Sequence, residues 1–183
     1  GAINTLFLYT NFLTDHYYGL VAFLLSAANI IMPFMAFGVH NAIVKFYTTF
    51  KTNNSINSFL SLTLFLPLVF IIPVSIIGYF SYDTIGVFLS KENGIGENYV
   101  WHIFILAIAM AYFEIFFAWS KVQMQTVFGN VMKEIFHRVC IMFLLFAVYM
   151  NWLIIDEFIL ALVAVYVLRM LFMMFYAFSI RFP

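Results

Sequence analysis

The chain has 183 residues, of which 66% are hydrophobic and only 9% are charged, and its formal net charge is zero. Soluble domains have roughly 25% charged residues, so this composition excludes an ordinary soluble domain and predicts an integral membrane protein. The long apolar segments lack the alternation of membrane β-strands, which indicates helices. No basic run suggests a nucleic-acid partner. The single cysteine, Cys140, excludes an intramolecular disulfide and a cysteine-based metal site.

We expect an all-α integral membrane fold, a bundle of six spanning helices that occupies residues 1–183 as one unit. The first apolar run, residues 2–13, is too short to cross a membrane, so we interpret it as the end of a truncated first helix. The other five helices are expected at residues 17–38, 56–80, 99–119, 135–152 and 158–180. The chain would then be a piece of a longer protein.

Three prolines lie within the expected helices, Pro33 in the second and Pro67 and Pro73 in the third. A proline removes a backbone hydrogen bond, so we expect both helices to be kinked or broken and to border a cavity. Residues 39–50 are amphipathic and are expected to continue the second helix toward the interface.

Basic residues predict the orientation of the chain. Six of the eight Lys and Arg residues fall on one side of the expected membrane: Lys45, Lys51, Lys121, Lys133, Arg138 and Arg181. Lys91 falls on the other side, and Arg169 lies within a span. By the positive-inside rule the first side is cytoplasmic, and so are both ends of this piece. Residues 120–138 are expected to be a polar connection that is helical at its end, with contacts between Lys133 and His137 and between Glu134 and Arg138.

Two charges lie within expected spans, Glu114 in the fourth helix and Arg169 near the middle of the sixth. A cation at that depth costs about 2.5 kcal/mol or several times more, so it needs water, a partner or a substrate. An intramembrane Glu114–Arg169 pair is expected if the two helices are neighbours. Two interpretations stay open, a structural pair and a charged position on a transport path.

Other candidate residues are few. Lys45, with His40 and Asn41 one turn before it, forms a basic patch near the expected cytoplasmic opening of the bundle. This patch is either an interfacial anchor or a substrate contact. The histidines have no companions at metal-ligand spacing, so we expect no metal site. No Ser/His/Asp arrangement, glycine-rich phosphate loop or acid pair occurs, so we expect no enzyme activity and no cofactor.

Two motifs resemble a known family. Residues 8–19, LYTNFLTDHYYG, resemble the LYTRxLxxxxYG turn that follows the first span of polysaccharide flippases. Residues 37–47, FGVHNAIVKFY, resemble the xGxxxAIxRFY end of their second span. These are the Wzx-like O-antigen and polysaccharide exporters of the multidrug/oligosaccharidyl-lipid/polysaccharide superfamily. Beyond residue 47 the likeness is limited to the number and spacing of the spans.

The resemblance implies a function. Members of the family have two six-helix lobes and use alternating access to move undecaprenyl-diphosphate-linked oligosaccharide across the bacterial cytoplasmic membrane. This chain would be the N-terminal lobe, with a C-terminal lobe of the same chain and the lipid-linked substrate as partners. Basic cavity residues would meet the diphosphate, which makes Lys45, with His40 and Asn41 beside it, a candidate for substrate binding. Arg169 matches no motif of the family, so it is a substrate-binding candidate on the physical argument alone. Lys45 stands where the family has Arg, and it keeps the charge without the bidentate fork.

Two other functions stay open. A drug or small-molecule exporter of the same superfamily would be driven by a coupling cation and would favour acids and aromatic residues in its cavity. A membrane-embedded glycan-processing enzyme would need a catalytic cluster in a large loop, and the loops here are short.

Overall fold

The computed structural model describes residues 15–50, 52–80, 82 and 99–183, and the regular structure in those residues is helical. The helices are α2 (Asp15–Ala36), α3 (Val39–Phe46), α4 (Asn53–Phe80), α6 (Val100–Lys121), α7 (Val127–Val131), α8 (His137–Tyr149) and α9 (Ile155–Ile180). A 3₁₀ turn, Tyr47–Thr49, follows α3, and a π-helical segment, Met132–Phe136, joins α7 to α8. The all-α prediction is confirmed.

Within the described residues, α2, α4, α6 and α9 are long and apolar enough to cross a membrane, as expected of a multi-pass helical membrane protein. The sequence predicted these four helices to within a few residues at most of their ends. The expected first helix and most of the loop over residues 81–98 lie outside the described residues.

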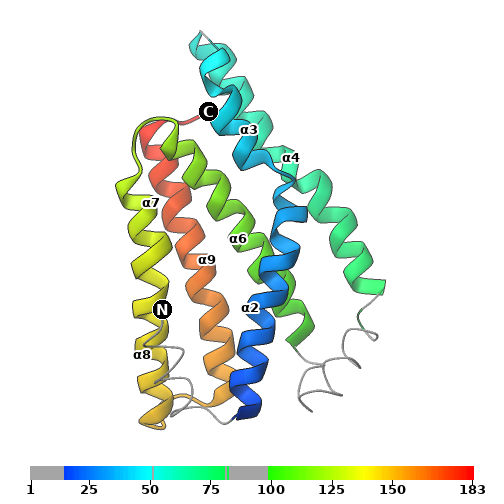
Figure 1. Ribbon diagram of the computed structural model, residues 1–183, viewed down its shortest axis with the longest axis vertical. Coiled ribbons are helices and arrows are strands. Elements are labelled where there is room, and N and C mark those ends of the chain that lie inside the picture. The colour runs from blue at the N-terminus through cyan, green and yellow to red at the C-terminus, as the bar shows by residue number, and fades with distance from the viewer. Residues whose placement is uncertain (1–14, 51, 81, 83–98) are drawn as a thin grey trace.

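Helix α6 is the centre of the bundle. In its most apolar stretch 61% of the residues are buried, against 22% in α4. Figure 1 shows α2 and α9 beside α6, the run from α7 to α8 beside α9, and α4 at the outer edge beyond α2. The small residues Ala107, Ala111 and Ala118 of α6 are all buried, and small side chains let neighbouring helices approach closely.

Side-chain hydrogen bonds fix both ends of α9. At its start, the hydroxyl of Tyr99, the residue before α6, donates to the carboxylate of Asp156. At its end, Nε of Arg181 donates to Oδ1 of Asn57 in α4, at 2.9 Å. The first of these contacts shows that α6 and α9 begin at the same end of the bundle and run in the same direction, as Figure 1 also shows.

Helix α2 does not continue into residues 39–50, contrary to prediction. Phe37 and Gly38 both have left-handed backbone conformations, with φ of 44° and 68°, and this ends the helix at Ala36, three residues after Pro33. The ring of Phe37 stacks on Phe70 of α4, with ring centroids 3.5 Å apart, which stabilises the unusual conformation. Helix α3 is therefore a separate short helix, and its buried Val39 packs against α6.

Helix α4 passes through both of its prolines as one helix of 28 residues, so it is not broken. Pro67 is buried and Pro73 is exposed. Near Pro67, the hydroxyl of Tyr112 in α6 donates a hydrogen bond to the carbonyl of Leu64, at 3.2 Å. This hydrogen bond joins α6 to α4 beside Thr63, whose carbonyl is the one that Pro67 leaves without a helical donor.

The expected polar connection over residues 120–138 is mostly helical, which corrects the predicted boundary of the fifth helix. Only residues 122–126 form the turn, and one helical run then extends from Val127 to Tyr149. The helical run therefore begins eight residues before the predicted start at residue 135. The described basic residues at helix ends are Lys45, Lys121 and Arg181, in or next to the last turns of α3, α6 and α9.

Candidate functional site

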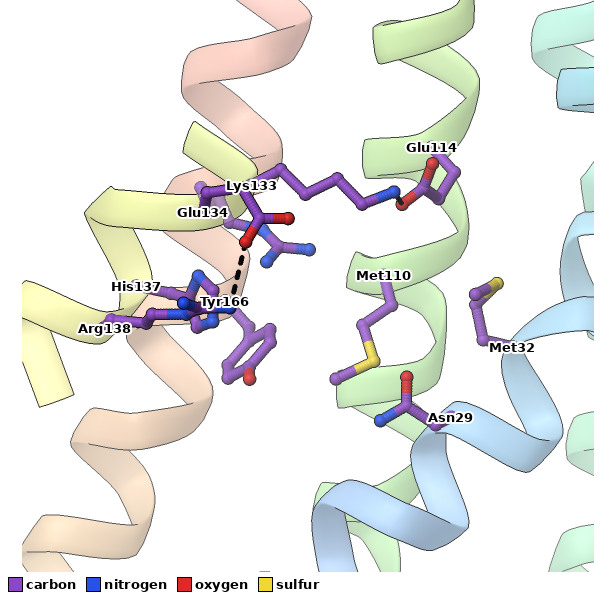
Figure 2. Close-up of a pocket in the computed structure, with 10 residues that line it drawn as sticks. Asn29, Met32, Met110, Glu114, Lys133, Glu134, His137, Arg138 and Tyr166 are labelled. Atoms are coloured by element: carbon purple, nitrogen blue, oxygen red, sulfur yellow. Dashed lines mark hydrogen bonds and ion pairs between the residues drawn. The ribbon is translucent and has the colours of Figure 1, made fainter. Parts of the chain in front are cut away.

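A cavity of about 260 Å³ lies between α2, α6, α9 and the run that contains the π-helical segment (Figure 2). Charged and polar side chains form most of its wall. Its lining residues are Asn29, Met32, Met110, Glu114, Lys133, Glu134, His137, Arg138, Tyr166 and Arg169.

The charged part of the cavity lies within the spanning helices, about two-thirds of the way along α6 and near the middle of α9. Glu114 is the fourteenth residue after Val100, where α6 begins, and Arg169 is the fourteenth after Ile155, where α9 begins. At 1.5 Å per residue both lie ~21 Å from the same end of the bundle. A hydrocarbon core is about 30 Å thick, so neither charge lies at a membrane surface.

Arg169 is buried, with 7% of the residue exposed. Its guanidinium carbon lies 4.0 Å from the centroid of the Phe113 ring and 5.1 Å from that of Tyr166. Its buried Nε has no hydrogen-bond acceptor, and among the described residues no ion pair to this side chain is found. A desolvated cation–π contact contributes about 2 kcal/mol, which is less than the several kcal/mol that burying an ion costs. Arg169 is thus a cation that the described residues only partly compensate.

Glu114 does not pair with Arg169, so that expectation is wrong. Its Oε1 is 2.6 Å from Nζ of Lys133, and Figure 2 shows the Lys133 side chain extending across the cavity to reach it. Lys133 therefore does not make the contact with His137 that the sequence suggested. The predicted pair of Glu134 with Arg138 is confirmed, with 2.9 Å between Oε2 and Nη2.

The π-helical segment explains why Lys133 points into the cavity. In an α-helix, residues five apart are separated by about 140° around the axis. A π turn is closed by a hydrogen bond between residues five apart, which brings such residues toward one face. Lys133 and Arg138 are five apart, and both line the cavity. Single π turns inside α-helices are frequent at functional sites.

The cavity wall has a net positive charge. Lys133, Arg138 and Arg169 contribute three positive charges and Glu114 and Glu134 two negative ones, which leaves one positive charge with His137 neutral. Each carboxylate has a closer partner than Arg169. Charges attract more strongly in a low-dielectric setting than in water, so this site suits an anionic group.

Polar groups without charge surround the cations. His137 lies against Tyr166, with ring centroids 5.8 Å apart, and its buried Nδ1 has no hydrogen-bond partner. Asn29 is on the α2 side, where its amide donates to the carbonyl of Leu25 at 2.9 Å. Among the described residues, no group of three His, Cys, Asp or Glu side chains is placed to hold a metal ion.

The other candidate residues do not reach this cavity. His40, Asn41 and Lys45 are on α3, and none of them is among the residues that line the cavity. Asn41 and Lys45 are exposed, and Nζ of Lys45 lies 5.1 Å from the ring centroid of Phe46. Of the four substrate-binding candidates, the structure places only Arg169 in the cavity.

Sequence reasoning missed most of the cavity wall. Lys133, Glu134, His137 and Arg138 were expected on the helical end of a cytoplasmic connection, because the positive-inside rule assigned Lys133 and Arg138 to the cytoplasmic side. Their spacing could have predicted a shared polar face. In a helix that contains a π turn, four polar residues within six positions can lie on one side of the helix.

The prolines were expected to mark the helices that border a cavity. Helix α2, which contains Pro33, contributes Asn29 and Met32 to the wall, whereas none of the described lining residues comes from α4.

Comparisons of the chain with protein-family models, with curated proteins and with solved structures found no match.

Proposed function

We propose that the chain is the N-terminal lobe of a transporter that moves lipid-linked oligosaccharide across the bacterial cytoplasmic membrane. The lipid would be undecaprenyl diphosphate, and the lobe would have six spans, a truncated first helix and both ends in the cytoplasm. The resemblance of residues 8–19 and 37–47 to polysaccharide flippases supports this substrate class. The basic residues at the ends of α3, α6 and α9 support the orientation.

One observation carries the proposal, the partly compensated Arg169 in a cavity at mid-membrane depth. A diphosphate that crosses the membrane must lose most of its hydration, and a fixed cation at mid-depth lowers that barrier. The ion pairs of Glu114 and Glu134 occupy the carboxylates that would otherwise neutralise Arg169. The arrangement therefore fits the transient binding of an anionic headgroup.

The test is export by cells that depend on the full-length protein. Arg169→Ala should abolish polysaccharide export while the amount of protein in the membrane stays near that of the wild type. Arg169→Lys should retain part of the export, because it keeps the charge but not the planar fork. Lys121→Ala is the matched control, since it removes an exposed cation at the end of α6, outside the cavity.

Normal export by Arg169→Ala at normal abundance would contradict the proposal. Loss of the protein from the membrane, in both Arg169→Ala and Arg169→Lys, would instead assign Arg169 a structural role. If export by Lys121→Ala falls to the level of Arg169→Ala, the assay responds to the loss of any cation. That result would also count against a specific role of Arg169.

A further inference from the structure

Glu114 lines the same cavity as two cations that it attracts, Lys133 and Arg169. It is paired with Lys133. It also follows Phe113, the residue whose ring lies under the guanidinium of Arg169, and it attracts the Arg169 charge across the cavity. Glu114 and Arg169 lie at the same depth on adjacent helices that run in the same direction. Lys133 and Arg169 are therefore alternative partners for one carboxylate.

We infer that Lys133 determines whether Arg169 can bind an anionic substrate, because Lys133 occupies Glu114. This inference rests on the proposed function and assigns a role to a second residue of the same site. Lys133 acts through Glu114 and not by contact with the substrate, so it is a positioning residue. When Lys133 is withdrawn, Glu114 pairs with Arg169 and the site no longer attracts an anion.

The position of Lys133 depends on a local feature of the helix. Nζ of Lys133 reaches Glu114 from the π-helical segment, and it also lies 5.7 Å from the ring centroid of Phe117 in α6. A π turn has one residue more than the α turn that it replaces, so conversion to an α-helix would rotate the preceding residues by about 100°. That rotation would move Lys133 away from Glu114. A rearrangement of helix α7 that converts the π turn to an α turn would thus separate Lys133 from Glu114 and leave Glu114 without its partner.

Glu134 does not offer Arg169 the same alternative. It is bound to Arg138 one helical turn away on its own helix, and that pair does not depend on the packing of two helices. The Lys133–Glu114 pair joins two helices, so a relative movement of the two helices changes it. Of the two carboxylates, Glu114 is the one whose partner can change during transport.

The test measures binding of farnesyl diphosphate to the purified full-length protein in detergent, with farnesol as the uncharged control. Wild-type protein should prefer the diphosphate to the alcohol, and Arg169→Met should lose this preference. Lys133→Met should weaken diphosphate binding by about tenfold or more, within the usual range of coupling between sites. The double variant Lys133→Met with Glu114→Gln should regain wild-type affinity to within about threefold, because Arg169 is again unpaired.

Three outcomes separate the explanations. Diphosphate binding by Lys133→Met that equals binding by the wild type overturns the inference. A loss of affinity in Lys133→Met that the added Glu114→Gln does not rescue shows that Lys133 is a direct ligand, and this also overturns the inference. A wild-type protein that does not distinguish farnesyl diphosphate from farnesol overturns the proposed function itself. Recovery in the double variant supports the inference when Lys133→Met and the double variant unfold at the same temperature, and recovery that only follows a regained unfolding temperature overturns it.

A second measurement needs no ligand. Unfolding temperatures of Glu114→Gln, Arg169→Met and the double variant give the coupling between these two positions. The coupling should be small in the wild-type background and should rise when the same cycle is repeated with Lys133→Met. Equal coupling in the two backgrounds would show that Glu114 does not change partner, and would overturn the inference whatever the binding results are.

Discussion

Arg169 of α9 lies on the ring of Phe113 in α6, with 4.0 Å between its guanidinium carbon and the ring centroid. The ring is fully buried. An aromatic face attracts a cation without neutralising it, whereas a carboxylate would cancel its charge. The contact therefore holds Arg169 in place and leaves its charge available.

Replacement of this ring should destabilise the protein measurably. Phe113→Leu should lower the free energy of unfolding by about 2–3 kcal/mol, from the lost packing and the lost cation–π contact. Thermal unfolding in detergent measures the effect. Phe175→Leu is the matched control, because Phe175 is on α9 and 64% exposed, and it should change the stability little.

The part of this loss that depends on the cation can be measured separately. Phe113→Leu should cost less in an Arg169→Met background than in the wild type, by roughly 1–2 kcal/mol. The same cost in both backgrounds would mean that Phe113 is only a packing residue.

A second prediction concerns the contact of α7 with α6. A Cβ atom added at Gly129 would lie 2.2 Å from Cδ2 of the Phe117 ring. Gly129→Ala should therefore destabilise the protein by about 1–3 kcal/mol, although alanine is the better helix former. Gly129→Ala combined with Phe117→Leu should recover much of this loss in the same unfolding measurement. A stability gain from Gly129→Ala alone would contradict the close packing.

The hydrogen bond between Tyr99 and Asp156 joins the starts of α6 and α9. Tyr99→Phe should lower the unfolding free energy by about 1.5–3 kcal/mol, the usual contribution of a hydrogen bond to a charged group. Tyr79→Phe is the control, because Tyr79 is 64% exposed. Equal unfolding temperatures for Tyr99→Phe and the wild type would contradict a stabilising role.

The same hydrogen bond predicts a dependence on pH. Burial, and then the hydrogen bond to Asp156, raise the pKa of Tyr99 from 10.0 to about 12. The folded protein thus holds this proton more tightly than the unfolded chain does, so the contribution is complete below pH 10 and is lost as the pH rises toward 12. The stability difference between wild type and Tyr99→Phe should shrink over that interval. A difference that stays constant from pH 9 to 12 would contradict the assignment.

The membrane orientation can be tested with single cysteines in a Cys140→Ala background. Trp152, between α8 and α9, is 80% exposed, whereas Lys121 is at the opposite end of the bundle, at the end of α6. In intact cells an impermeant thiol reagent should label Trp152→Cys, and it should label Lys121→Cys only after the membrane is permeabilised. The reverse pattern would invert the proposed orientation.

The sequence predicted most of the helical framework. Four long apolar segments became α2, α4, α6 and α9, because a stretch of about 20 apolar residues satisfies its backbone in a membrane only as a helix. Of the contacts, the Glu134–Arg138 pair was predictable, because residues four apart on a helix face one another.

The rest depended on contacts between distant parts of the chain. The start of the fifth helix was placed too late because the charges of Lys133 and Glu134 favour a position at the membrane surface until their partners are known. The Glu114–Arg169 pair was expected because no other intramembrane cation was recognised. The break at Phe37 involves the ring of Phe70 in another helix, and no local pattern predicts that stacking.

The most direct test of the central claim, that Arg169 serves the passage of an anionic lipid-linked substrate, is flipping by the full-length protein in proteoliposomes. A fluorescent prenyl-diphosphate oligosaccharide on the inner leaflet should become accessible to an impermeant quencher with wild-type protein and not with equally reconstituted Arg169→Ala. Arg169→Lys should give an intermediate rate. Flipping by Arg169→Ala at the wild-type rate, or by the wild type no faster than by empty vesicles, would contradict the claim.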